Sequence, residues 1–348
     1  MHTISTTDMR DFTVLMTSCS PRKTGIIHCI KDNEDGVNVT IYCTNCREEE
    51  LPSSFVCEKA FVTPSNDSPD YINHLLALCA TCHVDIVIPR LSSELEVLAS
   101  NRKMFEDIGV KVSVTDLDGL LVANDKSRLY ARYSELMPKQ VVGSNSSEVL
   151  EFAKAFPKFC CKLPHSSGAT GFAIVDDKLC DDVNLFHAYG QKHYISTQHL
   201  CRIIDTQHLN YILQEYVDGY DYTVSLIADH GKVTHIVGYV GYEMEFSCIM
   251  YGEIKDNEQA FEISKSIVAA LNLSGNIGID FILKPDGSVV LLEINPRLNA
   301  TLPFVAKAGC NMPYLNCKRL LGYDISQDGK NIVNGLKMRK HYATEYFI

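Results

Sequence analysis

Three polar side chains end an apolar segment in the stretch LLEINPRLNAT, residues 291–301. Glu293, Asn295 and Arg297 follow one another at intervals of two, so on an extended strand they project from the same face. Carboxylate and amide oxygens with room left for water and phosphate are the ligands that Mg²⁺ prefers. An arginine fork can bind a phosphoryl group through two hydrogen bonds. The spacing therefore indicates chemistry on a metal-bound phosphate.

A second carboxylate, Asp280, precedes this stretch on the far side of a tight turn. The turn is formed by residues 285–287 (Pro-Asp-Gly) between two apolar segments, which predicts a hairpin over 276–297. Cross-strand pairing can bring Asp280 beside Glu293 and Asn295. These three residues are therefore the predicted metal ligands. The alternative is a strand end whose carboxylates form salt bridges with the nearby arginine.

Lys162 lies in CCKLP, an otherwise apolar strand, where a lysine must reach an anion or escape to water. The turn HSSGATGF follows it, and the backbone N–H groups around Ser167, Gly168 and Thr170 can cradle a phosphate. The turn lacks the GxxxxGK[ST] pattern, and an ordinary hairpin turn is the alternative.

The elements that must position these residues fall into two groups. Up to about residue 115, apolar strands at 12–18, 37–43 and 85–89 alternate with helical periodicity, including one helix over SELEVLASNRKMFEDIG. This alternation predicts a parallel, doubly wound sheet. The following strands, FPKFCCKLP, FAIVDD, YILQEYVDGYDYTVSLIAD and HGKVTHIVGYVGYEMEF, follow an antiparallel pattern. The predicted class is α/β with an α+β second part.

Composition sets the limits of the function. The chain has 348 residues, of which 46% are hydrophobic and 22% charged, enough for two or three compact domains. The net charge of −11 argues against a nucleic-acid or anionic-membrane partner. The opening MHTISTTDMRDF is polar where a signal peptide has an apolar segment, so a cytoplasmic protein is expected.

In order and spacing these elements resemble the ATP-grasp ligases, especially the branch similar to carbamoyl-phosphate synthase and the amino-acid ligases. The resemblance covers most of residues 10–320, and GNIGIDFILKPDGSVVLLEINPR, its most specific part, looks like the family's metal-binding hairpin. It implies a Rossmann-like domain at 10–115 that helps to hold the acceptor substrate. It further implies a two-lobed ATP-grasp domain at 116–320, with a small lid lobe at about 140–215, and a C-terminal extension at 321–348.

The resemblance also implies roles at the phosphates. Asp280, Glu293 and Asn295 would hold one or two Mg²⁺ ions, or Mn²⁺ in their place, on the phosphates of ATP. Arg297 would neutralise the transferring phosphate. Lys162 matches the strand lysine that contacts phosphate and adenine, and Lys126 resembles an earlier basic residue that reaches the triphosphate from the other side.

For the rest of the nucleotide, SSGATG (Ser167, Gly168 and Thr170) resembles the glycine-rich flap over the triphosphate. ILQEYV resembles the hinge that binds adenine, with residues Glu215, Tyr216 and Val217. Asp221 takes the place of a ribose-binding glutamate and is one methylene shorter. The segment GYEMEFSCIMYGEI departs from the family because it carries only acids, Glu243, Glu245 and Glu253, where many relatives have a basic residue. The acids would favour an amino group on the acceptor, or they mark an exposed strand edge.

The implied activity joins a small-molecule carboxylate and an amine, with amino acids as candidates. The carboxylate attacks the γ-phosphate of ATP, and an amine then displaces phosphate from the acyl-phosphate. The alternatives are a carboxyphosphate- or carbamoyl-phosphate-forming activity and a non-catalytic nucleotide-binding regulator. Many members of the family form dimers, so a homodimer is a further hypothesis.

The cysteines raise the question of zinc. Fourteen are scattered through the chain, and Cys43, Cys46, Cys79 and Cys82 form two C-x-x-C pairs. The gap between the pairs exceeds the usual ribbon spacing, and the second pair falls in a predicted helix. Buried reduced thiols are the default interpretation, with structural zinc as the alternative.

Overall fold

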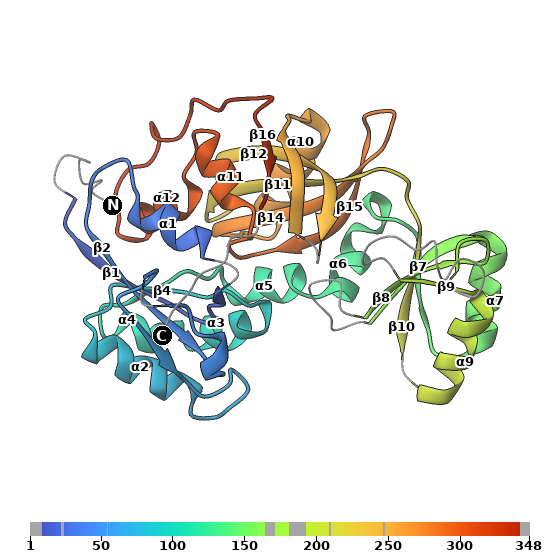
Figure 1. Cartoon of the computed structure of the whole chain (residues 1–348), viewed down its shortest axis with the longest axis horizontal. Coiled ribbons are helices and arrows are strands. Elements are labelled where there is room, and N and C mark those ends of the chain that lie inside the picture. Colours follow the sequence, from blue (N-terminus) through green and yellow to red (C-terminus); the bar gives the residue numbers. More distant parts are fainter. Residues whose placement is uncertain are drawn as a thin grey trace.

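The structure is a computed structural model that describes residues 9–21, 24–53, 55–163, 171–180, 193–208, 210–245 and 248–341. In this part of the chain the strands form three sheets, one in each of three regions that follow one another along the sequence (Figure 1). No described helix has the length and apolarity that crossing a lipid bilayer requires.

The first sheet has five parallel strands in the order β3-β2-β1-β4-β5, which confirms the predicted doubly wound arrangement. Its strands are β1 (Phe12–Met16), β2 (Val39–Asn45), β3 (Lys59–Val62), β4 (Ile86–Ile88) and β5 (Lys111–Val112). Its helices are α1 (Gly25–Lys31), α2 (Tyr71–Thr81), α3 (Leu95–Ser100) and α4 (Arg102–Glu106), followed by α5 (Leu117–Ala123). Val14 and Leu15 of β1 are both fully buried but belong to different apolar clusters, because helices cover both faces of the sheet.

One predicted helix of this region is wrong in detail. The segment 93–109 forms two helices, α3 and α4, rather than one. Asn101 lies between them and donates its side-chain amide to the carbonyl of Val97 at 2.8 Å. Such local bonding of asparagine to the backbone competes with helix continuation.

The second sheet forms the lid lobe, in green on the right of Figure 1. Its strand order is β6-β10-β7-β8-β9, with β6 (Gln140–Gly143), β7 (Lys158–Lys162), β8 (Phe172–Asp176), β9 (Tyr194–Ile195) and β10 (Tyr211–Glu215). Helices α7 (Ser146–Ala155) and α9 (Thr197–Gln207) lie against each other on this sheet. Phe152 of α7, Ile204 of α9 and Leu213 of β10 share their apolar cluster, which explains the amphipathic spacing of both helices.

The third sheet has six strands and, with the helices that pack on it, forms the large lobe. Its strand order is β15-β14-β11-β12-β13-β16, with β11 (Tyr220–Asp229), β12 (Lys232–Glu245), β13 (Cys248–Ile254), β14 (Gly275–Leu283), β15 (Val289–Asn295) and β16 (Lys337–Arg339). The helices of this lobe are α6 (Lys126–Tyr133), α10 (Glu258–Ala270), α11 (Leu302–Lys307) and α12 (Met312–Leu320). Short 3-10 turns lie at Glu48–Glu50, Ser92–Glu94 and Ser134–Leu136. Residues of α10 and of α11–α12 belong to different apolar clusters, which cover opposite faces of the sheet.

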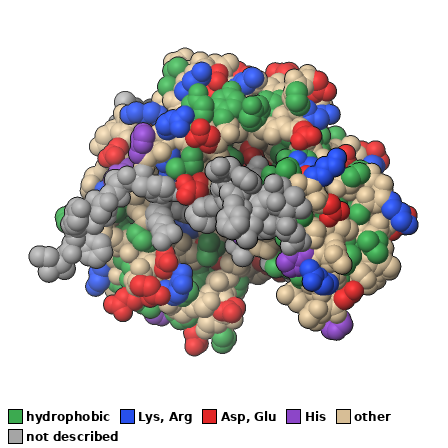
Figure 2. Space-filling view, turned by 45° about the vertical axis from the view of Figure 1, so that its right-hand side comes forward, with side chains coloured by type: hydrophobic (Ala, Val, Ile, Leu, Met, Phe, Trp, Pro, Cys, Tyr) green, Lys and Arg blue, Asp and Glu red, His purple; other side chains and the backbone are tan. Residues whose placement is uncertain are grey.

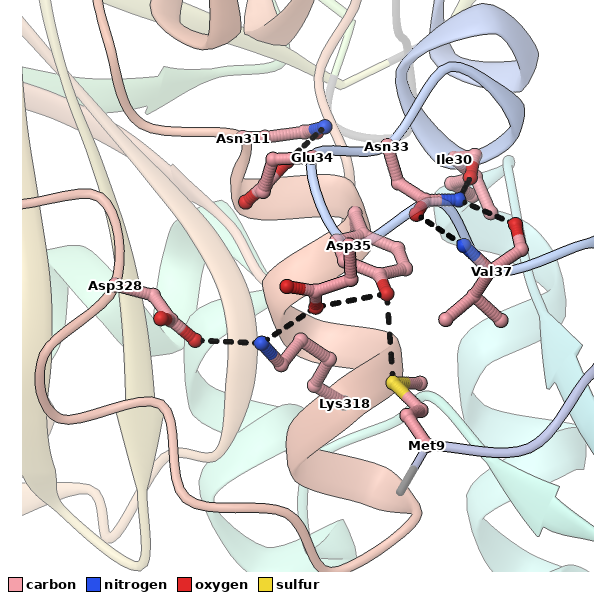
Figure 3. Close-up of polar contacts among 10 residues, drawn as sticks. Met9, Ile30, Asn33, Glu34, Asp35, Val37, Asn311, Lys318 and Asp328 are labelled. Carbon is pink, nitrogen blue, oxygen red and sulfur yellow. Dashed lines mark hydrogen bonds and ion pairs between the residues drawn. The ribbon is translucent and has the colours of Figure 1, made fainter. Parts of the chain in front are cut away.

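A buried lysine joins the first sheet region to the large lobe (Figure 3). Lys318 of α12 is fully buried, and its Nζ lies 2.7 Å from carboxylates of both Asp35 and Asp328. Asp35 belongs to the loop between α1 and β2, and it also accepts the hydroxyl of Tyr314 at 3.0 Å. Residues of β1, β2, α11 and α12 share one apolar cluster as well, so the two regions pack as one body.

Candidate active site

The hairpin β14–β15 brings the three predicted metal ligands together. Asp280 lies directly opposite Glu293, and Gly278 lies opposite Asn295. The Asn295 amide donates to Asp280 Oδ2 at 2.7 Å and to Glu293 Oε1 at 3.5 Å. Thr223 of the neighbouring strand β11 donates its hydroxyl to Asp280 Oδ1 at 2.6 Å. Two carboxylates and an amide therefore face the same side of the hairpin.

The negative charge of Glu293 disfavours ionisation of Asp280. Burial, followed by the like charge of Glu293, raises the pKa of Asp280 to about 7. The Thr223 hydrogen bond opposes this shift in the pKa of Asp280 but does not cancel it. Removing a carboxylate from water beside a second negative charge is costly unless a cation compensates. The pair thus has the electrostatics of a cation site.

The donor set suits Mg²⁺, which prefers hard oxygen ligands. The carboxylates of Asp280 and Glu293 would be its direct ligands. The Asn295 carbonyl oxygen accepts from Arg297 Nη2 at 3.2 Å, while the amide nitrogen faces the carboxylates. Asn295 must therefore turn its side chain to offer oxygen to a cation, and until then its N–H groups hold the two carboxylates in place.

Three basic side chains converge on this cluster from different elements. Lys126, at the start of α6, lies 3.5 Å from Glu293 Oε2. Lys162, at the end of β7, donates to Gln214 Oε1 at 2.6 Å. Burial lowers the pKa of Lys162, the charge of Glu293 raises it, and the neighbouring charge of Lys126 lowers it. Lys126 therefore contacts the carboxylates, and Lys162 is near enough for the charge of Glu293 to affect its pKa.

Arg297 is held from three sides. Its guanidinium donates to the Ser92 hydroxyl at 3.0 Å, to the Leu298 carbonyl at 3.1 Å and to Asn295. Burial lowers the pKa of Arg297, while the charges of Asp280 and Glu293 raise it. Ser92 belongs to the loop after β4, so the first sheet region contributes directly to the surroundings of the cluster.

Two glutamines of the lid lobe were not predicted from the sequence. Gln214 is only 4% exposed, and besides accepting from Lys162 it donates to Gln140 Oε1 at 3.1 Å. This chain of amides fixes the direction of the lysine side chain. The sequence did contain a signal for Gln214, because it is an amide on an otherwise apolar strand next to the hinge motif. A buried amide needs hydrogen-bond partners.

A cavity of about 270 Å³ lies beside the hinge. Its lining includes Met137, Pro138, Glu215, Val217, Lys284 and Val290. Val290 pairs with Ile282, two residues from Asp280, so it lies on the same face of the hairpin as the carboxylates. The cavity and the carboxylate cluster are therefore neighbouring parts of one surface.

The remaining predicted nucleotide residues surround this surface. Glu215 Oε2 accepts the backbone N–H of Lys139 at 3.2 Å, and the Tyr216 ring lies 3.7 Å below the Lys158 ammonium group. Asp221 lies on β11 opposite Ile282, and its negative charge contributes to the raised pKa of Asp280 after burial and Glu293. Ser167, Gly168 and Thr170 lie outside the described residues.

The acidic segment of β12 and β13 is covered by a strand that was not predicted. β16 pairs with β13, so within the described part of the sheet β13 is not an edge. Arg339 of β16 lies 3.1 Å from Glu243, and Lys337 lies 3.8 Å from Glu253. On the face shown in Figure 2, acidic and basic side chains are likewise interspersed, without an extended basic surface.

Among the described residues, no group of three or more His, Cys, Asp and Glu side chains is arranged to hold a metal ion. Cys43 and Cys79 are buried, Cys82 is partly buried and Cys46 is exposed, and all four are free thiols. The Asp280 cluster contains two carboxylates, those of Asp280 and Glu293. The side-chain amide of Asn295 would be its third ligand.

Two protein families match this chain. Residues 14–113 match the family described as "PylC-like, N-terminal domain". Residues 207–343 match the family described as "ATP-grasp in the biosynthetic pathway with Ter operon", a span that includes β11 and the carboxylate hairpin. The two matches fall on the first sheet region and on the large lobe.

Two curated relatives match parts of the chain. The carbamoyl phosphate synthase large chain of Archaeoglobus fulgidus is 24% identical over 253 residues, which cover 69% of this chain and 22% of that protein. The tyramine–L-glutamate ligase of Methanocaldococcus jannaschii is 32% identical over 98 residues, which cover 27% of this chain and 31% of that protein. The matched segments span less than a third of either relative.

The fold also matches solved structures. The biotin carboxylase domain of Hydrogenobacter thermophilus 2-oxoglutarate carboxylase, solved as a dimer with ADP, Mg-ADP and bicarbonate, has a TM-score of 0.67. The match covers 94% of this chain and 74% of that one at 13% identity, so it concerns the fold alone. The fold match agrees with the hairpin geometry and with the match of residues 207–343 to an ATP-grasp family, so the chain has an ATP-grasp fold.

Proposed function

We propose that this protein is an ATP-dependent ligase that joins a carboxylate to an amine through an acyl-phosphate and releases ADP and phosphate. One observation carries the proposal: Asp280, Glu293 and Asn295 share a hairpin face with the hinge cavity, and Lys126, Lys162 and Arg297 converge on them. A surface that only binds nucleotide does not need two adjacent carboxylates whose negative charges oppose each other.

In the proposed complex the base lies in the hinge cavity, against the backbone of residues 215–217, and the triphosphate extends toward Asp280 and Glu293. Mg²⁺ bound there would neutralise part of the phosphate charge. Lys126 and Lys162 contact phosphate oxygens from the two sides of the cleft. Arg297 faces the γ-phosphate and lowers the energy of the charge that spreads over its oxygens during transfer.

The reaction then needs no protein nucleophile. A carboxylate oxygen of the acid substrate forms a bond to the γ-phosphorus while the bond to the ADP oxygen breaks. The amine attacks the acyl carbon, loses a proton, and inorganic phosphate departs with the oxygen that came from the carboxylate. The role of this chain is to position both groups and to supply fixed charge.

The proposed substrates are small molecules, with amino acids as the first class to test. The named activity of one relative, a tyramine–L-glutamate ligase, joins an amine to an amino acid, which supports this choice. A homodimer is also proposed, and it is supported by the Hydrogenobacter thermophilus biotin carboxylase domain, which was solved as a dimer.

A second candidate is phosphorylation of bicarbonate, as in carbamoyl-phosphate-type synthesis. It is favoured by the match to a carbamoyl phosphate synthase large chain over 69% of this chain. The same fixed charges would stabilise transfer of phosphate to bicarbonate. The two candidates differ in whether ADP release depends on an organic acid.

The deciding experiment measures ADP release from Mg-ATP with pooled amino acids, with bicarbonate plus an amine, and with neither. Release that depends on particular acid–amine pairs is the expected result. Release with bicarbonate alone selects the second candidate. ATP binding without release under any of these conditions would contradict both and support a nucleotide-binding regulator.

A further inference from the structure

Arg90, in the loop after β4, is a buried cation that forms no salt bridge with the described residues. Its side chain is only 9% exposed, and its buried Nη1 has no hydrogen-bond partner among the described residues. Burial lowers the pKa of Arg90, and the like charge of Arg297 lowers it further against weaker opposing influences. An unpaired buried guanidinium is costly, so its retention indicates an anion that it binds.

The nearest acid does not fill this role, because its oxygens are already occupied. Glu94 is fully buried, and its Oε1 accepts the backbone N–H groups of Arg90 at 2.7 Å and Leu91 at 2.8 Å. Its Oε2 accepts the hydroxyls of Thr17 at 2.8 Å, Ser18 at 3.1 Å and Tyr71 at 2.7 Å. Glu94 thus fixes the loop that carries Arg90, while Nη1 of the guanidinium has no hydrogen-bond partner among the described residues.

The place of Arg90 in the sheet is that of a ligand site. The strand order β3-β2-β1-β4-β5 reverses direction between β1 and β4. In open parallel sheets, ligands bind beyond the carboxyl ends of the strands at such a reversal. Ser18 follows β1 and Arg90 follows β4, so both stand at this point. Ser18 also has a positive φ of 50°, a backbone strain that often accompanies binding sites.

The Arg90 loop lies next to the reacting centre without being part of it. Ser92, two residues on, accepts from Arg297 Nε, and Arg297 in turn contacts Asn295 of the carboxylate cluster. Arg297 therefore links the loop that carries Arg90 to the carboxylate cluster. An anion on Arg90 is a different group from the carboxylate that becomes phosphorylated.

We propose that Arg90 binds a second carboxylate of the acid substrate, so that this substrate is a dicarboxylic acid or an acidic amino acid. The inference rests on the proposed ligase function and names the acid for it. A single guanidinium carries one positive charge, which favours a carboxylate over a phosphate dianion. The anchored carboxylate would fix the substrate while its other carboxylate faces Arg297 and the nucleotide.

The first test uses binding, so it does not depend on turnover. Thermal unfolding of the full chain is measured alone and with Mg-ADP, in the presence of dicarboxylates from malonate to adipate, aspartate, glutamate, and the monoamide of each. In the wild type, at least one dicarboxylate is expected to raise Tm more than its monoamide does. In Arg90→Met this difference is expected to vanish, and Arg90→Lys is expected to restore part of it.

The stability of the unliganded variants separates binding from a structural role. Because Arg90→Met removes an unpaired buried charge, its Tm without ligand should equal or exceed that of the wild type. Arg10→Met, which alters an exposed arginine at the opposite end of the same sheet, should leave the response to dicarboxylates unchanged. A large fall in Tm on Arg90→Met, or a response to inorganic phosphate in place of dicarboxylates, would overturn the proposal.

Measurements of turnover test the role of Arg90 separately from the proposed ligase function. With the preferred dicarboxylate, Arg90→Met is expected to lower kcat/KM for ADP release about 100-fold, mainly through KM, since a charged pair is truncated. Equal loss with the monoamide, or no loss, refutes the role of Arg90 while leaving the ligase function in place. Selective binding of a dicarboxylate without any ADP release would refute the ligase function and keep the anion site.

Discussion

Lys162 illustrates how single residues in this site are held in surroundings that disfavour their charge. Among the described residues its ammonium group donates to an uncharged amide, Gln214, at 2.6 Å, and burial lowers the pKa of Lys162. Asp280 shows the opposite case, because burial beside Glu293 raises its pKa to about 7. Both charges are held in surroundings that disfavour them, as expected where phosphate and a cation are to bind.

Replacing the lysine tests this interpretation. Lys162→Met should weaken ATP binding roughly 10- to 100-fold, because a charge-assisted hydrogen bond is lost, while the lid lobe stays folded. Nucleotide affinity by titration calorimetry is the measurement. Lys154→Met, at an exposed position on α7 paired with Glu151, is the control. Unchanged affinity in Lys162→Met would remove this residue from the nucleotide site.

The carboxylate pair predicts a pH dependence. Since the folded state raises the pKa of Asp280 from 3.8 to about 7, it binds the proton more tightly than the unfolded chain does. This contribution to the free energy of unfolding is therefore lost as pH rises between those two values. Without divalent cations, Asp280→Asn should have a higher Tm than the wild type at about pH 8 and no advantage at about pH 4.

The control for this experiment is Asp286→Asn in the hairpin turn. Hydrogen bonds from Ser288 lower the pKa of Asp286, so its replacement should bring no gain in Tm at high pH. Adding Mg²⁺ at about pH 8 should reverse the order of wild type and Asp280→Asn, because only the wild type keeps both carboxylates. The same order with and without Mg²⁺ would argue against a cation at this pair.

At the scale of elements, the site depends on how helix α6 begins. Its N-cap Asp125 accepts the backbone N–H groups of Ser127 at 2.8 Å and Arg128 at 2.9 Å. Lys126 is the first residue of the helix, so this cap sets the direction from which its ammonium group approaches Glu293. A loss of the cap should therefore affect stability and nucleotide binding together.

Asp125→Ala should lower the free energy of unfolding by about 1 kcal/mol, the usual value of an N-cap, and should also raise KM for ATP. Asn145→Ala removes the equivalent cap of α7, where the side chain accepts the N–H of Glu148 at 3.1 Å. That variant should lose similar stability without the change in KM. Equal KM values for ATP in the two variants would show that the cap of α6 does not affect nucleotide binding.

At the scale of the whole molecule, the buried Lys318 joins the first sheet region to the large lobe. This connection matters for function because the Ser92 loop of the first region touches Arg297 in the large lobe. A shared apolar cluster and the 2.7 Å ion pair between Lys318 and Asp35 hold the two regions together. The relative placement of Arg90 and Arg297 follows from this packing.

Lys318→Met should lower the free energy of unfolding by about 3 kcal/mol, because two carboxylates lose their shared cation. Chemical denaturation is the measurement, and Lys330→Met, which removes a donor to the Thr234 carbonyl, is the exposed control. Double replacement of Asp35 and Asp328 by Asn together with Lys318→Met should recover part of the loss. Stability equal to the wild type in Lys318→Met would show that the apolar cluster alone joins the regions.

The sequence was sufficient where the decisive contacts are local. The Pro-Asp-Gly turn predicts the β14–β15 hairpin, but regular pairing from this turn would place Asp280 opposite Leu292, and a register shift between Asp280 and Phe281 places it opposite Glu293 instead. The parallel sheet follows from the alternation of short apolar strands and helices. These features depend on turn chemistry and periodicity, which neighbouring residues determine.

The sequence was insufficient where burial depends on distant segments. Arg90 follows a proline in a loop, where an exposed arginine is ordinary, and only the tertiary packing of this loop, whose backbone is bound by Glu94, makes it a buried cation. β16 pairs with β13 across a long separation in sequence, and its three residues have no pattern of their own. Such contacts are determined by the tertiary fold rather than by local preference.

The most direct test of the account is isotope transfer from the acid substrate to phosphate. Amino acids and dicarboxylates whose carboxylates carry a heavy oxygen isotope are incubated with Mg-ATP, an amine and the enzyme, and the released phosphate is analysed by mass spectrometry. An acyl-phosphate mechanism predicts one heavy oxygen in each phosphate formed. Glu293→Gln should be inactive, and Glu262→Gln, an exposed control on α10, should be fully active. Phosphate that carries oxygen only from water or ATP, or label recovered in AMP, would contradict an acyl-phosphate mechanism.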